Sequence, residues 1–197
     1  SGTQVVTLTI TENESAPTVT LTSNASSIAE NAGSSLTLTA TLSGKADAAV
    51  TVTIGTSGAG TEGTDYGTVS DITISAGNTT GTASFTPTDD SIYEGNETAV
   101  IDVSGVSGGG ASENGTAQVT LTITENESAP TVTLTSSASS IAENAGSSLT
   151  LTATLSGTTD ENVTVSISTS GTGTEGTDYG TISDITITAG NTTGTTT

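Results

Sequence analysis

The sequence predicts an all-β protein made of tandem seven-stranded β-sandwiches, and three observations support this fold class. Valine, leucine and isoleucine alternate with threonine and serine over short segments, which is the period-two pattern of strands with one buried face. No segment shows the 3.6-residue periodicity of an amphipathic helix. A 113-residue period runs through the chain, so the same strand pattern recurs.

The repeat defines the domain organisation. Residues 11–17 return as residues 124–130, and residues 27–33 return as residues 140–146. A unit of this length suits an independently folded domain better than a solenoid repeat. We therefore divide the chain into residues 1–16, the last strand of a preceding repeat; residues 17–129, a complete repeat; and residues 130–197, a partial repeat lacking its last strands.

Seven strands are expected in the complete repeat, each marked by apolar side chains at alternate positions. The interleaved threonines face solvent, where their β-branching favours the strand, and seven short strands of this kind predict a sandwich. In chain order the strands are marked by Val19 and Leu21; Leu36, Leu38, Ala40 and Leu42; Val50, Val52 and Ile54; Ile72 and Ile74; Ala83 and Phe85; Ala99, Ile101 and Val103; and Ala117, Val119, Leu121 and Ile123.

Composition excludes several classes of function. The 197 residues carry one lysine or arginine against 21 acids, a net charge of -20, which repels nucleic acid and anionic lipid head groups. The sequence has no histidine, cysteine, methionine or tryptophan, so the usual general bases, thiol nucleophiles, disulfides and zinc ligands are missing. No apolar run approaches a membrane span. We expect a protein that is not an enzyme and does not insert into membranes.

The densest group of acids lies in residues 89–97, which contain Asp89, Asp90, Glu94 and Glu97. Carboxylates this close repel one another, and a compact fold tolerates them best around a bound cation. If each strand reverses the direction of the last, three connections and the end of the final strand meet at one end of the sandwich. This brings eight of the 13 acids of the complete repeat together there: Glu30, Asp65, Asp89, Asp90, Glu94, Glu97, Glu125 and Glu127.

Calcium is the cation that such a cluster favours, because it takes roughly 6–8 hard oxygen ligands from flexible loops. The partial repeat keeps the counterparts Glu143 and Asp178 but ends before the counterpart of residues 89–97. A solvated acidic patch without a cation is the alternative interpretation of the same residues.

Three separated segments, residues 30–33, 63–66 and 89–97, resemble the Calx-β domain in order and spacing. The resemblance covers the whole complete repeat and implies a seven-stranded immunoglobulin-like sandwich that binds calcium in the loops at one end. It carries the calcium ligands onto Glu30, Asp65, Asp89, Asp90 and either Glu94 or Glu97. The chain has Glu125-Asn126-Glu127 where calcium-sensing members carry a run of aspartates.

These observations predict a structural, calcium-binding repeat array located outside the cell or on its surface, in a stalk, matrix or surface filament of bacterial type. Calcium would stiffen the junction at residues 125–130, and the partners would be neighbouring repeats or identical subunits end to end. Two alternatives remain open. One is a filament subunit completed by strands from its neighbour. The other is an adhesive module that binds a surface glycan or protein through the opposite loops, residues 44–47 and 105–114.

Overall fold

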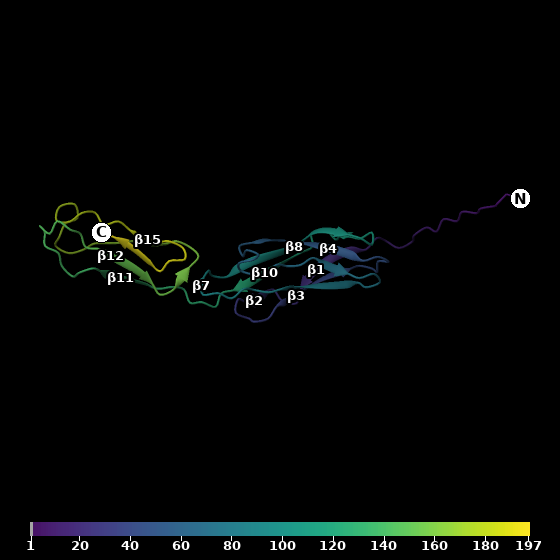
Figure 1. The fold of residues 1–197 in the computed structure, drawn as a ribbon, viewed down its shortest axis with the longest axis horizontal. Helices are drawn as coiled ribbons and strands as arrows, with labels where there is room; N and C mark the ends of the chain where they lie inside the picture. Colours follow the sequence, from purple (N-terminus) through teal and green to yellow (C-terminus); the bar gives the residue numbers. More distant parts are fainter. Residues whose placement is uncertain (1) are drawn as a thin grey trace.

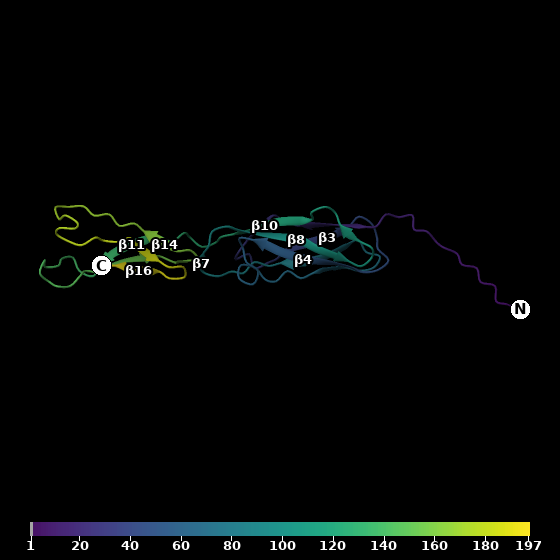
Figure 2. The same ribbon diagram turned by 90° about the horizontal axis from the view of Figure 1, so that it is seen from above.

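The computed structural model describes residues 2–197 as two β-sheet bodies arranged end to end, preceded by an extended segment (Figure 1). The view turned by 90° shows the same elongated arrangement (Figure 2). All regular secondary structure in the described residues is β-strand, which confirms the predicted fold class. In the same residues there is no helix long and apolar enough to cross a membrane.

The first repeat folds into two facing sheets. One has the strand order β6-β3-β1-β9 and the other the order β2-β10-β8-β4-β5. The strands are β1 (Thr18–Ser23), β2 (Ser27–Ala29), β3 (Leu36–Leu42), β4 (Val50–Gly58), β5 (Ile72–Ile74), β6 (Thr80–Phe85), β7 (Ile92–Tyr93), β8 (Glu97–Ser107), β9 (Ser112–Glu113) and β10 (Gln118–Thr124).

The core lies between these two sheets and is almost entirely aliphatic. Val19 and Leu38 from one sheet and Ile101 and Leu121 from the other are completely buried. They belong to the apolar residues at alternate positions of the predicted strands, so the period-two pattern correctly identified the inward face. At one end of the core the ring of Phe85 packs against Tyr66, with 4.8 Å between ring centroids.

Each of the seven predicted segments contains a strand, and three further strands were not predicted. β2 adds to β10 in parallel, with Ile28 opposite Ile123. β9 adds to β1 in parallel, and β7 pairs outside its own repeat. These strands have only two or three residues, which is too short for alternation to mark them, and they exist because a neighbouring strand offers a free edge.

The second repeat reproduces part of this architecture. Its sheets have the orders β11-β12-β16 and β14-β15, and β13 pairs with β7 of the first repeat. Val132 and Leu134 are 42% and 49% exposed, whereas their counterparts Val19 and Leu21 are 0% and 6% exposed. The strands are β11 (Val132–Ser136), β12 (Leu151–Leu155), β13 (Thr158–Thr159), β14 (Val163–Val165), β15 (Ile185–Ile187) and β16 (Thr193–Thr196).

Residues 2–16 form an extended segment outside both sandwiches (Figure 1). The apolar side chains of Val6, Leu8 and Ile10 are more than 80% exposed there. The prediction that residues 1–16 are the last strand of a preceding repeat stays a prediction, and Ser1 lies outside the described residues. The boundaries predicted after residues 16 and 129 likewise remain predictions.

Candidate metal centre

The acidic end of the first repeat is formed by three connections and the segment after β10. Three sets of carboxylates lie there, and within each set one oxygen from every residue lies within 4.8 Å of the others. Together they contain seven of the eight predicted residues of the first repeat, so these acids lie together at one end of the fold, as strand direction predicted. The sets are Glu30, Glu125 and Glu127; Glu30, Asp90 and Glu94; and Asp65, Glu94 and Glu97.

Glu30 belongs to two of these sets and is held by the pairing of β2 with β10. Ala29 lies opposite Thr124 in that pair, and the Glu30 N–H donates to the Thr124 carbonyl at 3.0 Å. This places the Glu30 side chain, only 6% exposed, next to the segment that follows β10. Its Oε1 accepts from the Asp90 N–H at 3.1 Å, and burial raises its pKa.

Asp65 lies in the connection between β4 and β5, immediately before the buried Tyr66. Its Oδ2 accepts from the Thr61 N–H at 2.5 Å, and its carbonyl accepts from the Thr88 N–H at 2.9 Å. The second bond ties this connection to the one that carries the densest acids. Asp65 is thereby fixed beside Glu94 and Glu97.

Glu125 organises the loop between β7 and β8 through backbone hydrogen bonds. Its Oε2 accepts from the N–H groups of Glu94 at 2.6 Å and Gly95 at 2.8 Å, and its Oε1 accepts from those of Asn126 and Glu127. Burial acts to raise the pKa of Glu125, but these hydrogen bonds outweigh it and lower the pKa to about 2. Glu125 is therefore an ionised clamp.

In three other carboxyls of the site the pKa is raised, whereas that of Glu125 is lowered. Burial, followed by the charges of Asp65 and other acids, raises the pKa of both Glu94 and Glu97 to about 7. A hydrogen bond shared with Glu125, together with burial, raises that of Glu127 to about 7. The buried Oε2 of Glu127 has no hydrogen-bond partner. Because burial and neighbouring negative charge disfavour the ionised form of these carboxyls, a positive charge placed among them would be stabilised.

Asp160, from the second repeat, belongs to none of the three clusters but lies near enough for its charge to act on them, and sequence reasoning missed it. Its charge contributes to the raised pKa of both Glu94 and Glu97. It follows β13, whose Thr158 and Thr159 pair in parallel with Ile92 and Tyr93. The strand-direction argument could have found it: applied to the second repeat, it places the connection before β14 at the end that faces the first repeat.

Asp89, Glu143 and Asp178 were predicted as ligands but join none of the clusters found in residues 2–197. The charge of Asp89 acts on Glu30 from nearby. Glu143 and Asp178 lie in the second repeat, where the chain has no counterpart of residues 89–97 to complete the set. Asp178 keeps the local geometry, because its Oδ2 accepts from the Thr174 N–H at 2.7 Å, as Asp65 does from Thr61.

The donor set fits a hard divalent cation. Every side-chain ligand offered is a carboxylate oxygen, the atom type that calcium prefers. The partnerless oxygen of Glu127 and the raised pKa of Glu94 and Glu97 are two independent signs that positive charge would be stabilised here. The residues present therefore fit the predicted ion, and the site lies where two β-sandwich domains meet.

Three solved structures are similar to the chain. The crystal structure of the apo-form Calx CBD1 domain is 17% identical, with a TM-score of 0.46, and the match covers 57% of this chain and 99% of that one. The calcium binding domain CBD12 of CALX1.1 is 18% identical, with a TM-score of 0.47 and coverages of 88% and 72%. CBD12 from CALX1.2 is 15% identical, with a TM-score of 0.45 and coverages of 86% and 70%.

By its own sheets and side chains, the chain is a tandem β-sandwich protein with an acidic, oxygen-lined centre at a domain junction. The family model of the Calx-beta domain matches residues 12–127 and again residues 125–193. The chain belongs to the Calx-beta domain family, which confirms the resemblance drawn from the three sequence segments. No curated protein sequence matches the chain.

Proposed function

We propose that this chain belongs to a structural, non-catalytic, calcium-binding array in which calcium stiffens the junction between consecutive repeats. The observation that carries the proposal is the position of Asp160. It lies on the second repeat, yet its charge bears on Glu94 and Glu97 of the first. The acidic centre therefore involves both domains, and a change in its charge acts on their relative placement.

Without a cation the carboxylates of the two repeats repel each other across the junction. The ends of the domains are held by one short parallel strand pair and by the hydrogen bond from the Thr158 hydroxyl to the Ser91 carbonyl, at 3.3 Å. Bound calcium would supply compensating positive charge. The ion would be held by carboxylates among Glu30, Asp65, Asp90, Glu94, Glu97 and Glu127, with Asp160 drawn toward it and Glu125 fixing the loop.

Small-angle X-ray scattering tests the stiffening. The full chain is measured in calcium and in chelator, and calcium is expected to give one elongated shape where chelator gives a broader range of shapes. Asp160→Asn is expected to weaken the response to calcium. Asp102→Asn, which removes one charge from β8 outside the three acidic clusters, is the matched control and should respond like the wild type. Identical scattering in calcium and chelator rejects the proposal.

The setting we propose for the array is an extracellular stalk, matrix or surface filament. Calcium modules that work outside cells bind with dissociation constants of about 10⁻⁴–10⁻³ M, so extracellular calcium could occupy a site of that affinity. Brief protease treatment of intact source cells checks the location. Surface exposure predicts loss of the protein while cytoplasmic markers survive, and complete protection of the protein contradicts it.

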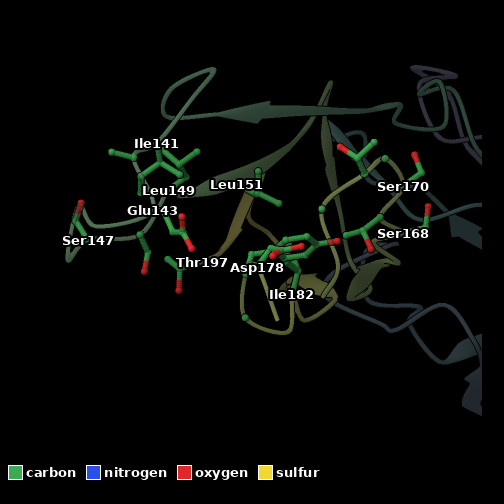
Figure 3. Close-up of a pocket in the computed structure, with 18 residues that line it drawn as sticks. Ile141, Glu143, Ser147, Leu149, Leu151, Ser168, Ser170, Asp178, Ile182 and Thr197 are labelled. Carbon is green, nitrogen blue, oxygen red and sulfur yellow. The ribbon is translucent and has the colours of Figure 1, made fainter. Parts of the chain in front are cut away.

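A second candidate function is strand complementation between subunits, and an open groove in the second repeat favours it. The groove has a volume of about 820 Å³. Figure 3 shows Ile141, Leu149 and Leu151 among its lining residues, with Ile182 in the same hollow. In the first repeat the counterpart of Ile141 is Ile28, which pairs with Ile123 of β10. The space left open is therefore next to the position that β10 occupies.

The exposed N-terminal segment has the sequence to enter this groove in another subunit. Residues 6–11 repeat residues 119–124 of β10. Electron microscopy and analytical ultracentrifugation of the full chain test the idea. Replacing Leu8 and Ile10 by aspartate should abolish any polymer, and the same replacement at Thr7 and Thr9, on the opposite face of the strand, should weaken it less. A chain that stays monomeric at high concentration excludes this candidate.

A further inference from the structure

The loop that follows β3 carries the only cationic side chain of the sequence, Lys45. Lys45 is exposed and precedes the buried Ala46. With the 113-residue period, Lys45, Ala46 and Asp47 correspond to Thr158, Thr159 and Asp160. Those residues of the second repeat contact or face the acidic end of the first. The equivalent surface of the first repeat, residues 45–47, is free of such a contact in the described structure.

The two loops have the same backbone conformation, so the correspondence holds in space as well as in sequence. The Ser43 N–H donates to Thr18 and the Ser156 N–H to Thr131, both at 2.9 Å. The Ala46 carbonyl accepts from Gly77 and the Thr159 carbonyl from Gly190, both at 2.8 Å. Lys45 therefore occupies the place that Thr158 takes in the second repeat.

The second repeat shows what a loop in this conformation binds. Thr158 and Thr159 pair with Ile92 and Tyr93 of the acidic connection, and the Thr158 hydroxyl donates to the Ser91 carbonyl. The pairing uses mainly backbone groups, so it does not depend on the side chain at position 158. A lysine at that position would place a flexible ammonium group next to the carboxylates of residues 89–97.

The segments that lead into the two repeats are also the same. Residues 11–17 and 124–130 are identical in sequence, and both join directly to the first strand of a repeat. In the second copy this segment connects the acidic end of one repeat to the first strand of the next, and Glu125 in it hydrogen-bonds the loop that follows β7. The first copy is suited to hold a preceding unit in the same way.

We propose that residues 45–47 form a docking surface for the acid-rich end of another Calx-beta repeat of this kind. The partner's counterpart of β7 would pair in parallel with residues 45 and 46, and the Lys45 ammonium would bind the partner's carboxylates in charge-assisted contacts. Such a junction carries its own positive charge, whereas the junction at Thr158 has none. In an array of these repeats, junctions with the lysine would then need less bound cation for their stability than junctions without it.

Zero-length carbodiimide cross-linking tests the contact directly. The protein is the full chain preceded by a further copy of residues 17–113, so that residues 1–16, the counterparts of residues 114–129, supply the last strand and the linker of the added repeat. The copied lysine is replaced by glutamine so that Lys45 is the only lysine. We expect an amide between Lys45 and an acid in the copied counterpart of residues 89–97, detected by mass spectrometry. Lys45→Gln should remove this product. A Lys45 cross-linked only to remote acids, or to none, overturns the proposal.

A second experiment uses the chain as it stands. Thr158→Lys should place a lysine at the existing junction, as Lys45 would at the proposed one. The added positive charge should lower the calcium affinity roughly tenfold. The chain should also keep one elongated shape in chelator. Thr154→Lys, on the solvent-facing side of β12, is the matched control. Unchanged affinity together with unchanged flexibility in chelator contradicts the proposal. The cross-link is measured without calcium. It can therefore form even if calcium does not stiffen the junction, so failure of the docking proposal can be told apart from failure of the proposed calcium function.

Discussion

Glu94 and Glu97 lie among enough burial and negative charge to raise the pKa of each to about 7. Near neutral pH the cation-free protein therefore holds protons on these groups, and calcium must displace them. We expect calcium binding at pH 6.5 to release roughly one to two protons per first repeat from these two groups. Calorimetry in buffers of different ionisation enthalpy measures this release. Glu97→Gln should reduce it and Asp102→Asn should not; binding without any proton release contradicts the assignment.

The same shifts predict how stability depends on pH without a cation. Both carboxyls have an ordinary pKa of 4.5, so between pH 4.5 and about 7 the folded chain binds more protons than the unfolded chain. Their stabilising contribution is complete below pH 4.5 and is lost as the pH rises through about 7. Glu125, with its pKa lowered to about 2, loses its own contribution only as the pH falls toward that value.

In chelator, thermal unfolding of the first repeat should therefore occur at least about 5 °C lower at pH 8 than at pH 5. Saturating calcium should remove or reverse this difference, because the ionised carboxylates then have a partner. Differential scanning calorimetry across the pH range measures it. A melting temperature that rises from pH 5 to pH 8 in chelator would show that the repulsion is not present in the folded state.

The sequence could predict which acids of the first repeat lie together. It could not predict the hydrogen bonds and neighbouring charges that set their pKa values. Strand direction placed Glu30, Asp65 and Glu125 at one end, because it requires only the strand order. It could not show that Glu125 accepts four backbone hydrogen bonds, since that depends on the local path of the loop. Asp160 was missed because, in the second repeat, only Glu143 and Asp178, the counterparts of ligands predicted in the first repeat, were considered.

At the scale of the strands, β4 and β8 approach closely at a glycine. Gly58 ends β4 with φ of 123°, and a Cβ there would lie 2.2 Å from the Thr98 carbonyl oxygen of β8. Its counterpart Gly171 has nearly the same φ, 126°, but a Cβ there would meet no atom within 4 Å, because the second repeat has no counterpart of β8 in the chain.

Alanine at these two positions therefore separates backbone strain from steric overlap. Gly171→Ala should destabilise the second repeat by the strain alone, about 1–3 kcal/mol. Gly58→Ala adds the clash with β8 and should destabilise the first repeat by about 3 kcal/mol or more. Calorimetric unfolding of the full chain follows both repeats. Equal costs for the two variants would show that β4 and β8 do not approach as closely as described.

Alternation identified the long strands because each buries one face against an opposing sheet. It could not identify β2, β7 or β9, whose positions are set by the edges to which they add. β7 is the clearest case: its partner Thr158–Thr159 belongs to another domain, so no pattern within the first repeat specifies it. The element that links the two domains is thus the one least visible in the sequence.

For the whole molecule, the two identical linkers provide a comparison within one chain. Glu12 and Glu14 are exposed within the extended N-terminal segment, whereas Glu125 and Glu127 are partly buried between two repeats. The linkers share their sequence, so a glutamate-specific protease meets the same cleavage sites in two structural settings. Any difference in cleavage rate then reports the protection given by the junction.

We expect cleavage after Glu125 and Glu127 to be at least about tenfold slower than cleavage after Glu12 and Glu14, since it requires local opening of the clamp. Calcium should slow cleavage further at the junction and leave the N-terminal sites unchanged. Asp160→Asn should lessen the calcium effect at the junction alone. Mass spectrometry of timed digests gives all four rates in one experiment. Equal rates in the two linkers would mean that the acidic centre does not hold the domains together.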